Sequence, residues 1–128
     1  MQTYSTNQFE IRIKDGLLEM RIEGVRTPGM SADAGRAFES LFRSAPVTAV
    51  AFDIRAIDFR ISGVDLESRS RHFARQCRGL PIAMIGRGDQ QEQMRIAIGV
   101  VDRMNGTARA FRSREKAHAW LRSVRQPA

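Results

Sequence analysis

Polar and apolar residues alternate along two short stretches near the start of the chain, residues 9–14 and 17–23. A period of two places successive side chains on opposite faces of a β-strand, so each stretch predicts a strand with one apolar face. Between them stands Asp15-Gly16, a pair typical of a type I′ turn because both of its positions require a positive φ. The sequence therefore predicts a β-hairpin over residues 9–23.

Four later segments carry apolar residues at every third or fourth position, the period of a helix with one buried face. After a turn at residues 24–30, the first helix is expected to begin with Ser31 as its N-cap. The second is expected from about Val64 to Arg78 and the third from Asp89 to Met104, and the last follows Ser113. The predicted core positions are, in chain order, Ala34, Ala37, Phe38, Leu41, Phe42, Leu66, Phe73, Cys77, Met94, Ala97, Ile98, Val101, Met104, Ala117, Trp120, Leu121 and Val124.

Short strands are expected between these helices. Residues 47–52 and 80–85 are mostly apolar, as suits strands buried on both faces, and residues 107–111 form a last short strand. The order β-β-α-β-α-β-α-β-α predicts an α/β fold with right-handed crossovers and a mostly parallel central sheet after an N-terminal hairpin. We expect residues 1–128 to form a single domain, with flexible ends at residues 1–8 and 125–128.

Composition narrows the class of protein. The chain is 42% hydrophobic and 27% charged, close to globular averages. No apolar run approaches the roughly 20 residues needed to cross a bilayer, and the first residues lack the layout of a signal peptide, so we expect a cytoplasmic protein. With Cys77 as its single cysteine, the sequence allows no intramolecular disulfide. Neither a metal nor a cofactor is expected, because no metal-ligand spacing or nucleotide-binding motif is present.

The net charge of +7 is distributed unevenly. Residues 1–64 hold 8 basic and 8 acidic residues, whereas residues 65–128 hold 13 and 6. Arg71, Arg75 and Arg78 fall on the outer face of the second predicted helix. A solvated helix face is the favoured interpretation of this stripe. An acidic protein partner or anionic headgroup is the alternative, and nucleic acid is the least favoured because no aromatic residues interleave with the arginines.

Other polar residues give little indication of catalysis. His72 and His118 both lie in polar helical stretches, which favours solvated side chains. No nucleophile, base and orienting residue can be assembled from the motifs, so we expect no enzymatic activity.

Ile96 and Val100 lie outside the predicted core stripe of the third helix, and we expect them to face a partner or a neighbouring helix.

The stretch DFRISG, from Asp58 to Gly63, joins a predicted strand to the second helix. Ser62 is in the position of an N-cap, whose oxygen accepts a backbone N–H. The alternative is a modified or ligand-binding hydroxyl. Were Ser62 phosphorylated, the nearby Arg60 and the helix N-terminus would stabilise the phosphate.

With this element order, residues 53–66, DIRAIDFRISGVDL, resemble the signature of the STAS family, the domain of anti-sigma factor antagonists and anion-transporter tails. The STAS/SEC14-like bacterial proteins are similar in the same ways. The resemblance rests on Asp53, residues 57–59 and Ser62-Gly63, and it implies a STAS-like fold over nearly the whole chain.

Family function runs through phosphorylation of the first serine in an Asp-Ser-Ser-Gly motif. If Gly63 is matched to the motif glycine, Ser62 takes the second serine's place, Ile61 the phosphorylated position and Arg60 that of the aspartate. This alignment implies that the usual phosphoserine switch is missing. A shift by one residue would instead make Ser62 the phosphorylated serine, and the sequence leaves both alignments open.

Two hypotheses follow. The first is a non-enzymatic, STAS-like regulatory domain of a bacterial protein, which docks a protein partner through its second and third helices. Its predicted partner surface comprises Arg71, Arg75, Arg78, Ile96 and Val100. The second is a module that binds a small ligand, lipid or anion in a cleft near Asp58, Arg60, Ser62 and Gly63. A homodimer through the third helix is left open.

Overall fold

The predicted hairpin is present in the computed structural model, which describes residues 2–6, 8–26 and 28–124. Strands β2 (Phe9–Lys14) and β3 (Leu17–Arg26) pair antiparallel. Asp15 and Gly16 join them with φ values of 52° and 79°, as a type I′ turn requires. The hairpin register places Phe9, Ile11 and Ile13 on the buried face.

The remaining elements follow the predicted alternation. They are α1 (Pro28–Ser44), β4 (Ala49–Phe59), α2 (Gly63–Gln76), β5 (Pro81–Ile85), the 3₁₀ turn η1 (Gly88–Gln90), α3 (Gln91–Arg103), β6 (Thr107–Phe111) and α4 (Arg114–Val124). The six strands form one sheet in the order β1-β2-β3-β4-β5-β6, in which β3 to β6 are parallel. The pairing of Val50 with Ile82 confirms that the two central apolar runs lie side by side and point the same way.

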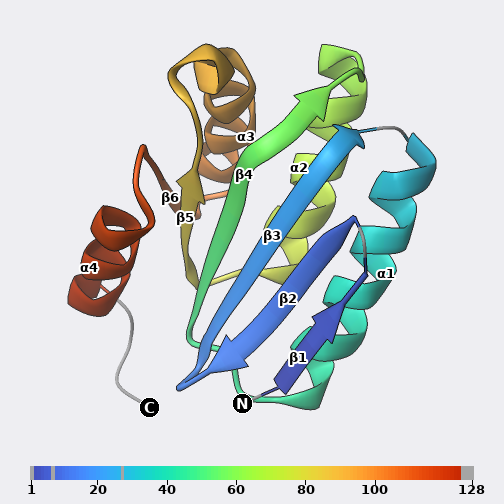
Figure 1. Cartoon of the computed structure of the whole chain (residues 1–128). Helices are drawn as coiled ribbons and strands as arrows, with labels where there is room; N and C mark the ends of the chain where they lie inside the picture. The colour runs from blue at the N-terminus through green and yellow to red at the C-terminus, as the bar shows by residue number, and fades with distance from the viewer. Residues whose placement is uncertain (1, 7, 27, 125–128) are drawn as a thin grey trace.

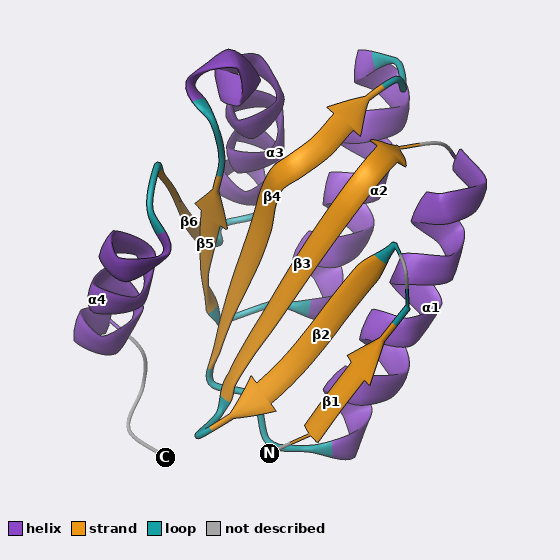
Figure 2. Cartoon of the chain, in the orientation of Figure 1, coloured by secondary structure: helices purple, strands orange, loops and turns teal. Residues whose placement is uncertain are grey.

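Figures 1 and 2 show how the helices cover the sheet: α1, α2 and α3 lie on one face, and α4 lies on the other. This follows from the strand order, because successive right-handed crossovers that move in one direction put their helices on the same face. The larger apolar core lies under α1, α2 and α3 and includes Phe38, Phe52 and Phe73, whose ring centroids are 5.0–5.6 Å apart. The smaller core, under α4, is built on small residues such as Ala49, Ala51 and Ala83.

The start of α1 and the start of the chain differ from the sequence prediction. Gln2–Ser5 forms β1, an edge strand antiparallel to β2, where no strand was predicted. Helix α1 begins at Pro28, so Ser31 lies inside the helix and is not its N-cap. Proline suits the first helical position because its fixed φ is helical and its missing N–H is not needed there. Residues 125–128 lie outside the described residues.

The largest difference concerns β4. Its predicted end at residue 52 is wrong, since the strand continues through Asp53 and Arg55 to Phe59. The register between β3 and β4 explains why the polar residues after Phe52 did not indicate a strand. Between the pairs Arg21 with Asp53 and Glu23 with Ala56, β4 holds one residue more than β3. Such a bulge interrupts the period of two on which sequence patterns depend.

Candidate functional site at the start of helix α2

The end of β4 that leads into α2 is held in place by Gln90, which is only 2% exposed. Its Nε2 donates to the carbonyl oxygens of Ile54 at 2.8 Å and Ile57 at 3.1 Å. Its Oε1 accepts the backbone N–H of Arg87 at 2.9 Å. Gln90 therefore satisfies two carbonyl groups in the part of β4 that continues beyond its last pair with β5, Asp53 with Ile85. Nothing in the sequence pattern singled out this residue, because a glutamine after a glycine-rich turn is usually solvated.

Ser62 is the N-cap of α2, as predicted. It has the extended conformation of a cap residue, φ −68° and ψ 161°, and its Oγ accepts the backbone N–H of Asp65 at 3.1 Å. Before it, Arg60 Nε lies 3.2 Å from Asp58 Oδ2, and both side chains are exposed. Gly63 is the first residue of the helix. The four residues predicted as a loop site are thus together at one end of α2, on the surface.

An exposed apolar side chain projects from the same turn. Val64, the second residue of α2, is 78% exposed, more than any other large hydrophobic residue in the described part of the chain. Ile61, on the other side of the cap, is half-buried. Isolated exposed apolar residues are common on protein surfaces. What distinguishes Val64 is its position between the charged pair of Asp58 and Arg60 and the outer face of the helix.

The predicted basic stripe is only partly free of ion pairs. Arg71 Nη2 lies 3.0 Å from Glu67 Oε1, and Arg103 of α3 reaches the same oxygen at 3.3 Å. Arg75 is exposed on the last turn of α2. Arg78 is exposed in the turn after the helix, which ends at Gln76 rather than at Arg78. Positive charge on this face therefore gathers toward the C-terminal end of α2.

The two apolar residues assigned to a partner surface on α3 have different environments. Val100 is 2% exposed and belongs to the main core, so its assignment to a partner surface is wrong. Val100 and Val101 are adjacent on α3, and both are buried in the main core, so the buried face of this helix is wider than the predicted stripe. Ile96 is half-buried, and its Cδ1 lies 4.0 Å from where a side chain would begin at Gly63. Ile96 therefore helps to close the gap between α3 and the start of α2.

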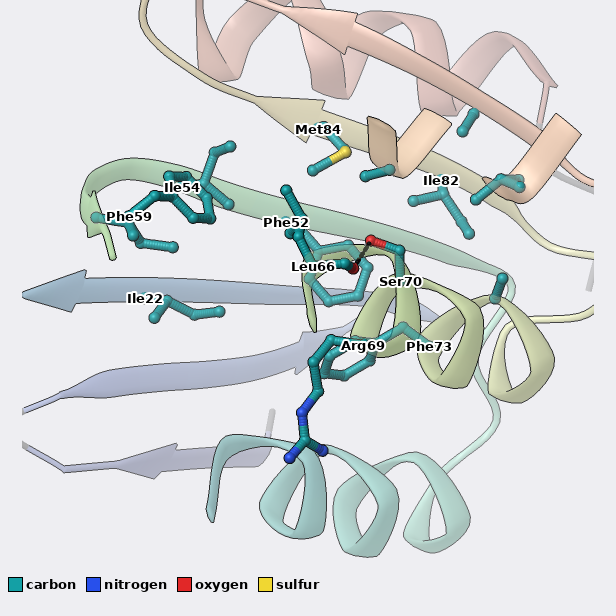
Figure 3. Close-up of a pocket in the computed structure, with 15 residues that line it drawn as sticks. Ile22, Phe52, Ile54, Phe59, Leu66, Arg69, Ser70, Phe73, Ile82 and Met84 are labelled. Carbon is teal, nitrogen blue, oxygen red and sulfur yellow. Dashed lines mark hydrogen bonds between the residues drawn. The ribbon is translucent and has the colours of Figure 1, made fainter. Parts of the chain in front are cut away.

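An apolar pocket lies beneath this turn, between the sheet and helices α2 and α3, with a volume of about 80 Å³. Figure 3 shows Ile54, Phe59 and Leu66 among its labelled lining residues, with Ser70 donating its hydroxyl back to the carbonyl of Leu66. The Arg69 side chain extends away from the apolar side chains that line the pocket. The lining favours an apolar occupant, since the one hydroxyl drawn here is already bonded.

A second group of polar residues lies on the opposite face of the sheet, where α4 begins. Glu19 of β3 accepts hydrogen bonds from Arg114 Nε and Nη2, both at 2.9 Å, and lies 2.7 Å from His118 Nε2. Burial alone would raise the pKa of Glu19, but the hydrogen bonds and charges of Arg114 and His118 outweigh it and hold the pKa below its ordinary value. The expectation that His118 is solvated is wrong.

Asp53 is buried beside this group. Its Oδ2 lies 2.8 Å from Arg55 Nη2, and its Oδ1 accepts the backbone N–H of Arg55 at 3.1 Å. These bonds join residues two apart in the sequence and hold the bulge of β4 in place. Among the described residues, no group of three or more histidine, cysteine, aspartate or glutamate side chains could hold a metal ion. No helix of the described chain is long and apolar enough to span a membrane.

Comparison with known proteins supports the fold. No protein-family model and no curated protein sequence matches the chain. The crystal structure of an anti-sigma factor antagonist from Mycobacterium paratuberculosis is similar with a TM-score of 0.65 and 16% identity, over 94% of this chain and 93% of that one. An uncharacterised DUF3478-family protein from Shewanella loihica PV-4 with a SpoIIAA-like fold has a TM-score of 0.63 and 22% identity, over 92% of this chain and 98% of its own. The chain therefore has a STAS-like fold, as the resemblance implied.

Proposed function

We propose that this STAS-like chain is a single, non-enzymatic interaction domain of bacterial regulation, which docks a protein partner in the cytoplasm through the start and outer face of α2. The observation that carries the proposal is the exposed Val64, flanked by Arg60 at the helix start and followed by exposed Arg75. Protein interfaces combine an apolar centre with a polar rim, and arginine is common in them. The antagonist from M. paratuberculosis is named for its action on another protein, which agrees with a protein partner here.

The phosphoserine switch has no place in this proposal. Ser62 Oγ already caps α2 through Asp65 N–H, and Ile61 occupies the position of the switch serine in the alignment on Gly63. Arg60, the cation that would stabilise a phosphate on Ser62, is already paired with the carboxylate of Asp58. We therefore propose that partner docking is constitutive at this surface.

Affinity capture from the native host tests the docking surface. The bait is the wild-type chain, compared with Val64→Asp and with the matched control Val124→Asp on α4. Val124 is also an exposed valine, 38% accessible, so its predicted place in the core is wrong. We expect a specific partner with wild type and with Val124→Asp, and its loss with Val64→Asp, because a charge cannot be buried in the apolar centre of an interface. Identical capture by all three baits would contradict the proposal.

A small apolar ligand is the second candidate function, and the pocket of about 80 Å³ under Phe59 and Leu66 favours it. A ligand that binds only the folded chain raises its melting temperature by mass action. We expect short-chain fatty acids, whose few carbons suit so small a volume, to raise the melting temperature of the wild type but not of Ala97→Met, whose longer side chain would fill the pocket from α3. No shift with fatty acids of several chain lengths would remove the support for this function.

A further inference from the structure

Strand β6 is the last strand of the sheet, and no other described strand pairs with its outer edge. Its register with β5 pairs Ile85 with Phe111, and the carbonyl of Phe111 accepts the N–H of Gly86 at 2.9 Å. In a parallel ladder, alternate residues direct both of their backbone groups to the same neighbouring strand. Phe111 faces β5, so Ala108 and Ala110 direct their N–H and C=O groups to the open edge.

The edge borders a groove of about 440 Å³ between α3, the end of β6 and the start of α4. Met94 and Ile98 of α3 line one part of it, together with Ala110. Met94 is buried in the core, so the apolar surface on this side comes from half-buried Ile98 and exposed Ala110. Unpaired backbone groups beside an apolar groove are the arrangement that proteins use to bind an extended peptide by strand addition.

The other side of the groove is cationic. Arg112 and Lys116 line it, both exposed, and Arg109 lies over the ring of Phe111 at 5.5 Å on the α4 side of the strand. Arg95, at the α3 side, forms an ion pair with Glu92, so it adds less net charge. An acidic partner is therefore favoured by charge, whereas a second copy of this chain would bring the same cations to the edge and be repelled.

We propose that the edge of β6 binds an extended, acidic segment of a partner protein as a seventh strand. Because side chains of a strand alternate between its two faces, the segment would place apolar side chains toward Ile98 and acidic side chains toward Arg109 and Lys116. This surface lies on different elements from the docking surface on α2. The two proposals can therefore fail independently.

The experiment measures binding of a fluorescent synthetic peptide, alternating glutamate and valine, by anisotropy. A peptide alternating lysine and valine is the control for charge. Ala110→Pro removes an N–H from the open edge without breaking the ladder to β5, since proline is tolerated at sheet edges. Ala110→Thr keeps that N–H and is the matched control. A double variant, Arg112→Glu with Lys116→Glu, tests the cations without altering the backbone.

We expect the acidic peptide to bind the wild type and Ala110→Thr with the same affinity. It should bind Ala110→Pro and the double variant at least about tenfold more weakly, a loss of about 1.4 kcal/mol or more in binding free energy. Amide exchange at Ala108 and Ala110 should slow when the peptide is bound. Three results would each overturn the proposal: equal binding of the acidic and basic peptides, an unchanged affinity in Ala110→Pro, and self-association of the chain through β6. Loss of binding in the double variant but not in Ala110→Pro would show nonspecific attraction of polyanions and would equally overturn it.

Discussion

Single side chains fix the local geometry on which the candidate site depends. Ser62 caps the start of α2, and Gln90 holds the strand that leads to it. The first was evident from the sequence, because capping acts over three residues and uses only a few residue types. The second was not, because Gln90 bonds to carbonyl groups that are 33 and 36 residues away in the chain.

Substitutions of Ser62 distinguish a structural role as the cap of α2 from a role as a phosphorylation switch. We expect Ser62→Ala to lower the free energy of unfolding by about 1 kcal/mol, because Asp65 N–H loses its acceptor, and Ser62→Asp to preserve it, since aspartate also caps helices. Chemical denaturation measures the unfolding free energy of both variants. The affinity of Ser62→Asp for the captured partner then tests whether a negative charge at this position affects docking. If Ser62→Asp kept the fold but abolished partner binding, a negative charge at this position would act as a switch.

Gln90 offers a sharper test of the packing behind the site. Gln90→Leu leaves the carbonyl groups of Ile54 and Ile57 without their donor. We expect a loss of about 2–4 kcal/mol in unfolding free energy, measured in urea, since each unsatisfied buried polar group costs about 1–3 kcal/mol. Gln91→Leu, at the exposed neighbouring position, is the control and should change stability by less than about 0.5 kcal/mol. Equal effects of the two substitutions would exclude this role for Gln90.

Cys77 has a pH dependence that follows from its burial, which raises the pKa of its thiol from 9.0 to about 12. The folded state thus favours the neutral thiol, and its contribution to stability is complete below pH 9 and declines as the pH rises toward 12. At neutral pH we expect no reaction with a thiol-specific reagent in the native protein and full reaction in denaturant. Rapid modification of the folded chain would show that the thiol is accessible.

At the scale of elements, helical stripes and short apolar strands were predictable, whereas the exact extent of β4 was not. The strand continues through Asp53, Arg55 and Asp58, which look like loop residues until their partners are known. Asp53 is buried because Arg55 neutralises it, and Asp58 is tolerated because it faces solvent. Strand β1 was not predicted because residues 2–5 are mostly polar and show no clear alternation of polar and apolar side chains.

The attachment of α4 to the sheet depends on Glu19, which links β3 to Arg114 and His118. Because its pKa is lowered in the fold, Glu19 stabilises the protein above the ordinary carboxyl value of 4.5, and this contribution is lost as the pH falls. We expect Glu19→Gln to cost about 1–2 kcal/mol at neutral pH and progressively less in acid.

Denaturation of Glu19→Gln at neutral and acidic pH, beside Glu23→Gln, measures this effect. Glu23 lies on the same strand but is exposed, so its substitution should have little effect at either pH. A difference between wild type and Glu19→Gln that stays constant with pH would mean that the charge of Glu19 does not stabilise the α4 contact.

At the scale of the whole molecule, chain order determines where the two proposed docking surfaces lie. Three right-handed crossovers put α1, α2 and α3 on one face of the sheet and leave α4 alone on the other. The α2 surface and the open edge of β6 therefore lie on separate parts of the molecule. The fold and the position of Ser62 followed from sequence, but the exposure of Val64, the burial of Val100 and the apolar pocket depend on how α2 and α3 pack together.

The central claim is that the start and outer face of α2 dock a protein partner. Titration of the isotope-labelled chain with the captured partner, followed by backbone amide shifts in NMR spectra, tests it most directly. We expect the largest changes at residues 60–64 and around Arg75 and Arg78. Changes confined to the pocket lining or to strand β6, with the α2 amides unmoved, would contradict the claim.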